Sequence, residues 1–445
     1  MKYKISRGKR ALGLSLALSG SLLVLPNLAR AEEGPVSAPV GLRTAMTAQN
    51  AGMGGQAPIS EAANEIYRTA QEDPGTGYAG IVLSTQDAGY TLSWKGELPQ
   101  AISRLITAHR GKGIRVAVTA STYTFKELDE RARAIMESGA TAGGAPIASA
   151  GPSSDGNSLT IGVDSSGLPA RNNLRDEAGT DSLPKSLSGG IPVKVTEEET
   201  PADIGYGARY TGSFEGKKVA GGMVIRGKAV CSSGFSAFSP ATNRYYMITA
   251  AHCVNGVGDT ITNAVGTPIG RVIDVQQSPD SALVELFPEV GAVDWVFTGY
   301  GVGLDPSGRK VMSEGRPFEG ELLCANGALL GEMCGAKVTK VDQYVKSEAT
   351  GYVRHVNKVE QVAGRTLAGS GDSGGSVFTY GMDGKVSARG ILSMSIHGYN
   401  CKNPLPTGNK TRPGCSEHAW ITNIYENTTS HNNVVKSLRV QAFDR

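Results

Sequence analysis

Short apolar or alternating runs, broken by Gly, Pro and Asn roughly every 8 to 12 residues, fill the chain from residue 219 to residue 445. This spacing is typical of antiparallel sandwiches and barrels, whose short strands are joined by tight turns. Segments with helical periodicity are scarce in this half of the chain. The pattern therefore predicts that residues 219–445 form an all-β domain.

Strand-like and helix-like segments alternate in residues 76–165. Ile102, Leu105 and Ile106 follow Pro99 at helical spacing, and proline is favoured where helices begin. A turn at residues 87–89 separates two alternating runs. These segments predict a small α+β unit without cysteine. The expected elements are strands at 78–84 and 90–94, a helix at 99–110, a strand at 114–118, a helix at 126–137 and a strand at 159–163.

Two further stretches lack a sustained apolar period. Residues 32–75 are rich in Ala, Gly and Pro, and we expect a flexible lead-in there. Residues 166–218 are rich in Gly, Ser, Pro and charged residues, which is typical of an exposed linker.

The first 31 residues have the pattern of a secretory signal peptide. They contain basic but no acidic residues, then an apolar run at 11–25 and the small residues around Arg30. The run falls short of the roughly 20 residues that span a bilayer. We therefore expect an exported, extracellular protein with no membrane anchor after signal removal.

Charge excludes two classes of partner. The chain has 44 basic and 41 acidic residues, a formal net charge of +3, and six of the basic residues lie in the signal segment. The remainder is nearly neutral, so it offers no field for nucleic acid or an anionic membrane. At 445 residues, with 59 glycines, the chain is long enough for several domains and suits turn-rich β structure.

The chain has six cysteines, all beyond residue 230. An even number in an exported protein indicates disulfides, and no Cys-x-x-Cys pair is present to hold zinc. We expect neither a metal nor a cofactor.

Two segments carry candidate chemistry. In the first, residues 247–253, an apolar strand ends in small residues and is followed by His252 beside Cys253, a rigid mounting that a catalytic base needs. Taken alone, His252 would more often be an ordinary loop histidine. In the second, residues 369–376, Ser373 lies among glycines, which allow a tight turn that presents a hydroxyl and backbone N–H groups.

Together these segments resemble the chymotrypsin-fold serine peptidases, and in particular the secreted bacterial streptogrisin and α-lytic branch, which carries an N-terminal prosegment. Residues 219–222 are similar to the mature start of that branch, and residues 324–335 to its cysteine loop. The resemblance implies two six-stranded antiparallel Greek-key barrels, preceded by the α+β prosegment domain. It also implies a zymogen that hydrolyses peptide bonds through a Ser-His-Asp triad.

The family order His, Asp, Ser implies Asp280 as the third member, since it precedes the strand-like segment 281–286. His252 would take the proton of Ser373, and Asp280 would hold the imidazole. The backbone N–H groups of Gly371 and Ser373 would form the oxyanion hole. The rival aspartates are Asp259, Asp274 and Asp294.

The resemblance also implies disulfides between Cys231 and Cys253 and between Cys324 and Cys334. Relatives usually have a cysteine just before the Gly-Asp-Ser segment, and this chain lacks one. We therefore expect the remaining two, Cys401 and Cys415, to close a local loop.

Asp372 would be a buried structural carboxylate that needs a cation. The arginine that relatives often place in the cysteine loop is replaced here by Ala325. Cleavage after Lys218 would free the ammonium of Val219 to pair with Asp372, and Arg354 or Arg365 is the alternative.

By the same resemblance the specificity pocket would be formed by five residues, with an apolar floor that favours cleavage after apolar or aromatic residues rather than basic ones. A preference for glutamate is the lesser alternative. The pocket residues are Leu367, Ser370, Ser393, Met394 and Ser395. Structural roles are expected for the other histidines, namely His109, His355, His397, His418 and His431, with His397 the exception worth testing because it follows the pocket wall.

The expected partners are polypeptide substrates and the chain's own prosegment, which would assist folding and inhibit the enzyme until cleavage within about residues 205–219. We expect a monomer. The competing hypotheses are a catalytically silent binding protein with the same fold and a hydrolase that acts mainly on esters.

Overall fold

The computed structural model describes residues 53, 55–73, 75–142, 144–164, 188–203, 218–298, 308–381, 383–395 and 414–440. The expected signal peptide, His397 and Cys401 lie outside these ranges. Within them, no helix has both the length and the apolar character needed to cross a membrane.

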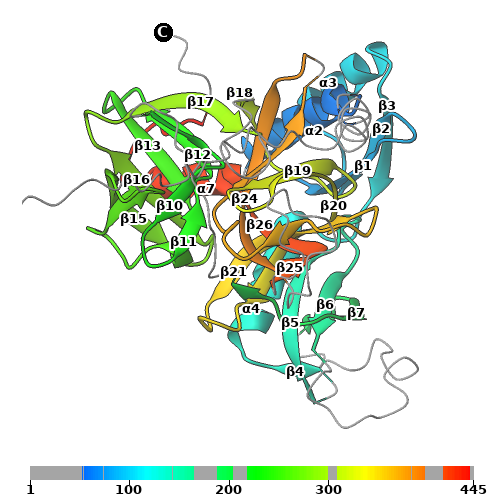
Figure 1. Ribbon diagram of the computed structural model, residues 1–445. Coiled ribbons are helices and arrows are strands. Elements are labelled where there is room, and N and C mark those ends of the chain that lie inside the picture. The colour runs from blue at the N-terminus through cyan, green and yellow to red at the C-terminus, as the bar shows by residue number, and fades with distance from the viewer. Residues whose placement is uncertain are drawn as a thin grey trace, which may run out of the picture. The chain divides into compact units, whose positions relative to one another are not determined.

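Residues 224–286 form an antiparallel sheet of seven strands in the order β11-β10-β14-β15-β16-β13-β12 (Figure 1). Its two edge strands, β11 and β12, are separated by only two residues of the chain, so the sheet curls on itself. Alternate side chains, among them Met247, Val272 and Val284, fill its interior. The strands are β10 (Val224–Arg226), β11 (Val230–Ser232), β12 (Phe235–Ser239), β13 (Arg244–Thr249), β14 (Thr260–Asn263), β15 (Pro268–Gln276) and β16 (Ser281–Leu286).

Six later strands form a closed antiparallel barrel, because each pairs with the next and the last returns to the first. Its interior is apolar and includes Leu323, Val338 and Val377. The predicted fold of two β-barrels is therefore confirmed, except that the first is a curled sheet of seven strands where six were expected. Around the ring the strands are β19 (Leu322–Gly327), β20 (Gly331–Lys346), β21 (Val353–Gln361), β26 (His418–Asn423), β24 (Val386–Ser395) and β23 (Ser376–Tyr380).

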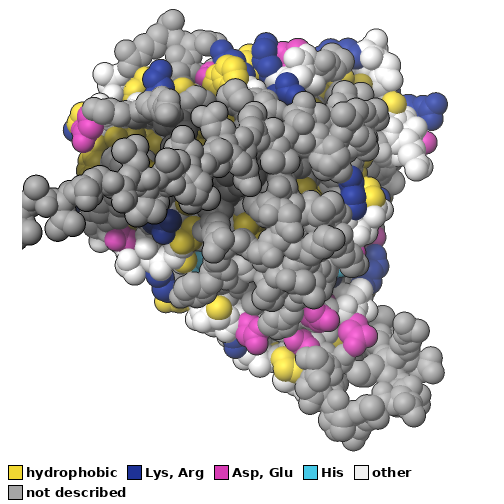
Figure 2. Space-filling view, in the orientation of Figure 1, with side chains coloured by type: hydrophobic (Ala, Val, Ile, Leu, Met, Phe, Trp, Pro, Cys, Tyr) yellow, Lys and Arg dark blue, Asp and Glu magenta, His cyan; other side chains and the backbone are white. Residues whose placement is uncertain are grey.

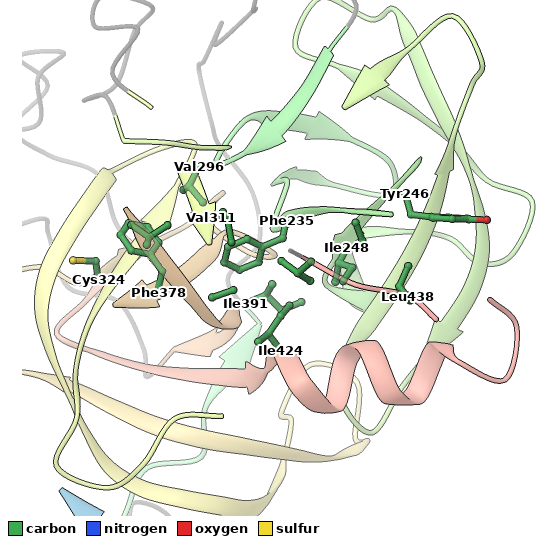
Figure 3. Close-up of a cluster of buried hydrophobic side chains, with 14 of the residues drawn as sticks. Phe235, Tyr246, Ile248, Val296, Val311, Cys324, Phe378, Ile391, Ile424 and Leu438 are labelled. Atoms are coloured by element: carbon green, nitrogen blue, oxygen red, sulfur yellow. The ribbon is translucent and has the colours of Figure 1, made fainter. Parts of the chain in front are cut away.

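A shared apolar cluster joins the two barrels (Figure 3). Phe235 and Ile248 enter it from the first barrel, Phe378 and Ile391 from the second, and Ile424 from helix α7 (Ile424–His431). The remaining strands of this half are β9 (Lys218–Gly221), β17 (Gly291–Phe297), β18 (Gly308–Glu314), β22 (Ala368–Gly369) and β25 (Cys415–Ser416).

The predicted elements between residues 76 and 165 are present. A three-stranded sheet, β1-β2-β3, packs with helix α3, and helix α4 begins with a capping box at Thr124. The sequence did not predict β4 (Thr141–Ala142) or β5 (Ala145–Pro152). The predicted elements are β1 (Tyr78–Ser84), β2 (Gly89–Trp94), α3 (Gln100–Gly111), β3 (Arg115–Ala120), α4 (Phe125–Glu137) and β6 (Leu159–Val163).

The expectation of a flexible lead-in is wrong for residues 57–71, which form helix α2 (Ala57–Gln71). The apolar face of α2 combines several alanines with Ile59 and Ile66, and its amphipathic pattern is as clear as that of α4, so the Ala, Gly and Pro content of residues 32–75 is what misleads the prediction. Preceding residues reach the second barrel, where the Gln56 side chain accepts a hydrogen bond from the Leu322 backbone N–H at 2.9 Å. Met53 is buried in the cluster between the barrels.

The expectation of an exposed linker is also wrong in part, because residues 193–197 form β7 (Val193–Glu197) parallel to β6. Beyond it, the buried Glu198 pairs with Lys340 and Lys358 at 3.0 and 2.7 Å. Acidic side chains gather on the molecular face in this region (Figure 2).

Two strands that precede residue 218 extend the sheet of the second barrel. Strand β5 pairs with β20, with Ser149 opposite Val345. Strand β8 (Ala202–Asp203) pairs antiparallel with Met394 and Ser395 of β24. Chain upstream of residue 218 therefore completes the hydrogen bonding of two barrel strands.

Candidate active site

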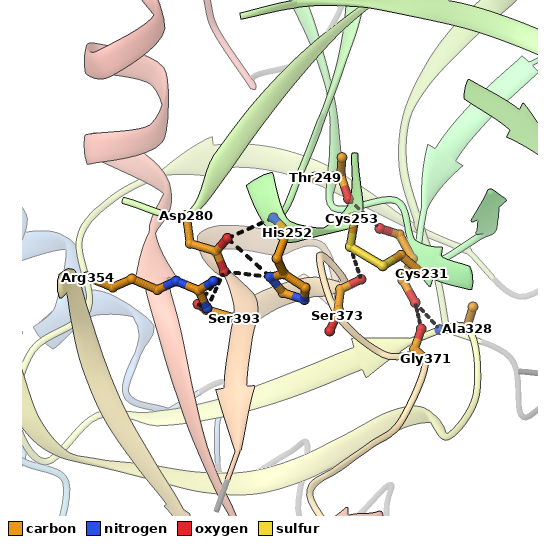
Figure 4. Close-up of a disulfide and its surroundings, with 11 residues drawn as sticks. Cys231, Thr249, His252, Cys253, Asp280, Ala328, Arg354, Gly371, Ser373 and Ser393 are labelled. Carbon is orange, nitrogen blue, oxygen red and sulfur yellow. Dashed lines mark hydrogen bonds and ion pairs between the residues drawn. A yellow bond between two sulfur atoms is a disulfide. The ribbon is translucent and has the colours of Figure 1, made fainter. Parts of the chain in front are cut away.

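His252 lies in a 3-10 turn, η1 (Ala251–Cys253), directly after β13 (Figure 4). The neighbouring Cys253 forms a disulfide with Cys231, as expected from the resemblance. The Thr249 hydroxyl donates to the backbone oxygen of Ser232 at 2.9 Å. These links fix the imidazole to two strands of the first barrel, which is what a catalytic base requires.

Asp280 is the residue directly before β16 and has a left-handed backbone, with φ of 47°. Its fully buried carboxylate accepts the backbone N–H of His252 at 3.1 Å and contacts His252 Nδ1 at 2.9 Å. Of the rivals, Asp274 contacts His431, Asp259 accepts from Asn255, and Asp294 pairs with Lys310. Asp280 is thus the candidate that the fold brings to His252.

Ser373 lies on a tight turn between β22 and β23, on the other side of His252 from Asp280 in Figure 4. Gly371 and Gly374 have φ of 105° and 78°, a region that favours glycine. A Cβ at Gly374 would lie 2.2 Å from Thr249 Oγ1. Ser232 N–H donates to the Ser373 carbonyl at 2.8 Å, so the turn is tied to the first barrel.

The other ring nitrogen of His252, Nε2, is buried and has no hydrogen-bond partner among the described residues. When Nδ1 donates to a carboxylate, Nε2 is the basic nitrogen of the neutral ring. The arrangement can therefore accept a proton at Nε2 while Asp280 stabilises the resulting imidazolium.

Asp372 is buried, and the partners that the structure shows for it are backbone N–H groups. Leu329 and Leu330 donate to Oδ1 at 2.8 and 3.1 Å, and Gly369 donates to Oδ2 at 2.9 Å. Burial raises the pKa of Asp372 to about 6, although these hydrogen bonds oppose the rise. Arg354 contacts Asp280 instead, at 3.1 Å, so its assignment to Asp372 is wrong.

The five residues expected to form a specificity pocket make different contacts in the structure. The Ser393 hydroxyl donates to Asp280 Oδ2 at 2.5 Å, so this side chain supports the carboxylate. The Met394 side chain packs in a buried cluster with Trp420, and Leu367 in another. Ser395 is the residue whose backbone pairs with β8, while Ser370 N–H donates to the Gly414 carbonyl at 3.0 Å.

The expected Cys324–Cys334 disulfide is also present. Cys415 is disulfide-bonded, but its expected partner Cys401 lies outside the described residues, so that pairing stays a prediction. Because these cysteines are oxidised, they offer no thiolate for a metal.

Sequence reasoning missed two residues near Asp280. Ser393 was assigned to the pocket, and Arg354 was considered only for Asp372. Neither has a local signal, since each occupies an ordinary alternating position of a strand and meets Asp280 only when the barrels pack.

No protein-family model matches the sequence, and no curated protein matches it. Solved structures do match.

The chain is similar to serine proteases of known structure.

A Nocardiopsis protease is 20% identical, with 51% of this chain and 100% of that chain covered and a TM-score of 0.38. Thermobifida fusca protease A is 18% identical, covering 51% and 99%, with a TM-score of 0.38. The alpha-lytic protease homolog N4 is 19% identical, covering 50% and 100%, with a TM-score of 0.37. These similarities involve about half of the present chain.

Proposed function

We propose that the chain is a secreted serine endopeptidase made as a zymogen, with Ser373, His252 and Asp280 as its catalytic triad. The observation that carries the proposal is the His252–Asp280 pair. A buried carboxylate contacts Nδ1 of an imidazole, and Nε2 has no partner in the described part of the chain. This leaves Nε2 as the general base for a serine on the adjacent glycine-rich turn.

In this mechanism the Ser373 hydroxyl attacks the peptide carbonyl while His252 Nε2 takes its proton. His252 then donates that proton to the leaving amine, and water hydrolyses the acyl-enzyme by the same route. Backbone N–H groups of Gly371 and Ser373 stabilise the oxyanion, typically by about 3 kcal/mol for each donor.

Chain upstream of residue 218 acts as inhibitor and folding assistant in this proposal. An extended peptide can bind by adding a strand to a sheet edge, and β8 pairs in this way with β24 beside Ser393. A substrate using that edge would compete with β8. Strand β5 pairs with β20, and a template of this kind helps barrels whose non-local strands fold slowly. Cleavage within about residues 205–219 then yields the active monomer, which prefers bulky apolar or aromatic residues.

A fluorophosphonate probe tests the proposed nucleophile. The processed wild-type protein should be labelled and should cleave casein, and Ser373→Ala should lose both properties. Ser430→Ala, a serine on α7 away from the glycine-rich turn, is the matched control and should be labelled like the wild type.

The outcomes separate the competing hypotheses. A folded protein that is not labelled would be a silent binding protein. A labelled protein that cleaves simple esters but neither casein nor a peptide library would be an esterase. Cleavage of the library mainly after Lys or Arg would contradict the apolar pocket.

A further inference from the structure

Arg354 is a fully buried arginine of β21, and it reaches the carboxylate that contacts His252 (Figure 4). Its Nη1 lies 3.1 Å from Asp280 Oδ2 and donates to Ser393 Oγ at 3.3 Å. The two ends of this ion pair come from different barrels, since Asp280 precedes β16 of the first and Arg354 belongs to the second. A buried ion pair of this kind is sensitive to the loss of either partner.

Asp280 therefore receives two cationic or potentially cationic neighbours. Burial alone would raise the pKa of the Asp280 carboxyl, but Arg354 foremost, followed by His252 and the hydroxyl of Ser393, holds that pKa below its usual value. The carboxylate is thus neutralised by Arg354 even while His252 is uncharged.

This arrangement changes the balance of charge when His252 takes up a proton. The 3.1 Å contact from Arg354 and the 2.9 Å contact from His252 Nδ1 share one oxygen, so the two nitrogens lie at most about 6 Å apart. A protonated His252 would place a second positive charge within that distance of the guanidinium. Loss of Arg354 would remove this repulsion and leave the Asp280 charge to act on His252 alone.

The charged groups on the neighbouring elements α7 and β15 have partners of their own. Glu426 of α7 contacts His355, the residue after Arg354, at 3.0 Å. Asp274 of β15 contacts His431 at 2.8 Å. Arg354 is the cation that the structure pairs with Asp280.

We propose that Arg354 is a positioning residue of the triad, which holds the Asp280 carboxylate toward His252 and opposes the second positive charge that forms beside it when His252 takes a proton. The proposal rests on the proposed function of the same site. The Arg354–Asp280 ion pair adds a polar contact between the barrels. This support for the triad therefore forms only when both barrels are packed together.

The test compares Arg354→Met and Arg354→Lys with the wild type, each processed from the full chain, by measuring kcat/KM from pH 4 to 10. Arg354→Met should move the acid limb of the profile upward by about one pH unit, which lowers kcat/KM at pH 7 by at most about 10-fold. Arg354→Lys keeps the charge, so its acid limb should stay near that of the wild type.

The matched control is Arg389→Met, which removes an equally buried arginine that pairs with Glu321 instead of Asp280. It should leave the acid limb in place. An unmoved limb in Arg354→Met, whatever its kcat, would show that Arg354 only fills space and would overturn the proposal. Wild-type enzyme without labelling or cleavage would instead refute the proposed function itself.

If Arg354→Met does not fold, the double variant Asp280→Asn/Arg354→Met decides the question. Removing both charges should restore folding, because the single variant would fail through an unpaired buried carboxylate. Circular dichroism would detect the folded protein. Failure of the double variant as well would mean that Arg354 is needed for packing alone, against the proposal.

Discussion

Asp372 makes the stability of the full chain depend on pH. The substitution Asp372→Asn isolates this dependence. Its carboxyl is 1% exposed and is held by backbone N–H groups alone among the partners the structure shows. Burial raises its pKa from 3.8 to about 6. Replacing it with Asn removes the titration and keeps the shape of the side chain.

The direction in which stability changes with pH follows from whether the folded or the unfolded state binds more protons. Between pH 4 and 6 the folded precursor keeps Asp372 protonated while the unfolded chain releases the proton, so stability falls as the pH rises. A shift of this size corresponds to about 3 kcal/mol in the free energy of unfolding. This stabilisation is fully present below about pH 4 and is lost above about pH 6.

The assay is urea unfolding of the Ser373→Ala precursor, with and without Asp372→Asn, at half-unit steps from pH 3.5 to 8. Tryptophan fluorescence is a suitable signal because Trp94 and Trp420 are buried. The amide of the Asn variant brings one N–H toward a backbone donor, which costs about 1–3 kcal/mol at every pH. The prediction therefore concerns how the difference between the two proteins changes with pH.

We expect that difference to change by about 3 kcal/mol between pH 4 and 7, in favour of the Asn variant at the higher pH. A difference that stays constant across this range would show that Asp372 does not titrate between the folded and unfolded states in this way. In the processed protein the dependence should reverse if the new ammonium of Val219 reaches Asp372, because a cation lowers the pKa of a carboxyl.

Four shorter predictions concern the same domain. Asp280→Asn should lower kcat roughly 10⁴-fold and also destabilise the fold, because it leaves the buried Arg354 without its carboxylate; near-normal turnover would shift the assignment to another aspartate. Replacing Cys231 and Cys253 by Ser should cost about 3 kcal/mol in urea unfolding, and an unchanged midpoint would contradict this. Gly374→Ala should abolish secretion of folded protein, because its Cβ would meet Thr249 Oγ1 and the Ser232 carbonyl; wild-type expression levels would count against the close packing. Residues 219–445 expressed alone should stay inactive, and spontaneous refolding to full activity would dismiss the prosegment as folding assistant.

The sequence predicts those parts of the site whose chemistry depends on residues next to one another in the chain. Ser373 is recognisable because a presented hydroxyl needs glycines on both sides, and His252 because it follows an apolar strand beside a cysteine. Asp280 follows only from a family order. Its left-handed backbone, with φ of 47°, is a conformation that aspartate adopts more readily than most residues, but the rival aspartates share that tendency, so it does not single out Asp280.

The barrels are predictable as a class, whereas the strands that dock on them are not. Helix α2 has an amphipathic pattern as clear as that of α4, but the composition of residues 32–75 favours a flexible segment and so hides it. Strand β7 is missed because a charged segment forms it. Its neighbour Glu198 is held in its buried position by Lys340 and Lys358 of the second barrel and by Ser149 of β5. Such contacts join residues far apart in the chain, and no local pattern encodes them.

The strand register links the chain upstream of residue 218 to the proposed triad through Arg354. Ser149 of β5 lies opposite Val345 of β20, and Val345 lies opposite Arg354 of β21. Docking of β5 therefore stabilises the strand pair that presents Arg354 to Asp280 across the barrel interface. Because a buried arginine without its carboxylate is costly, the second barrel gains stability when it packs against the first. A prosegment that fixes β20 would thus favour the packing that also completes the triad, so assisted folding and assembly of the catalytic site would share one set of contacts.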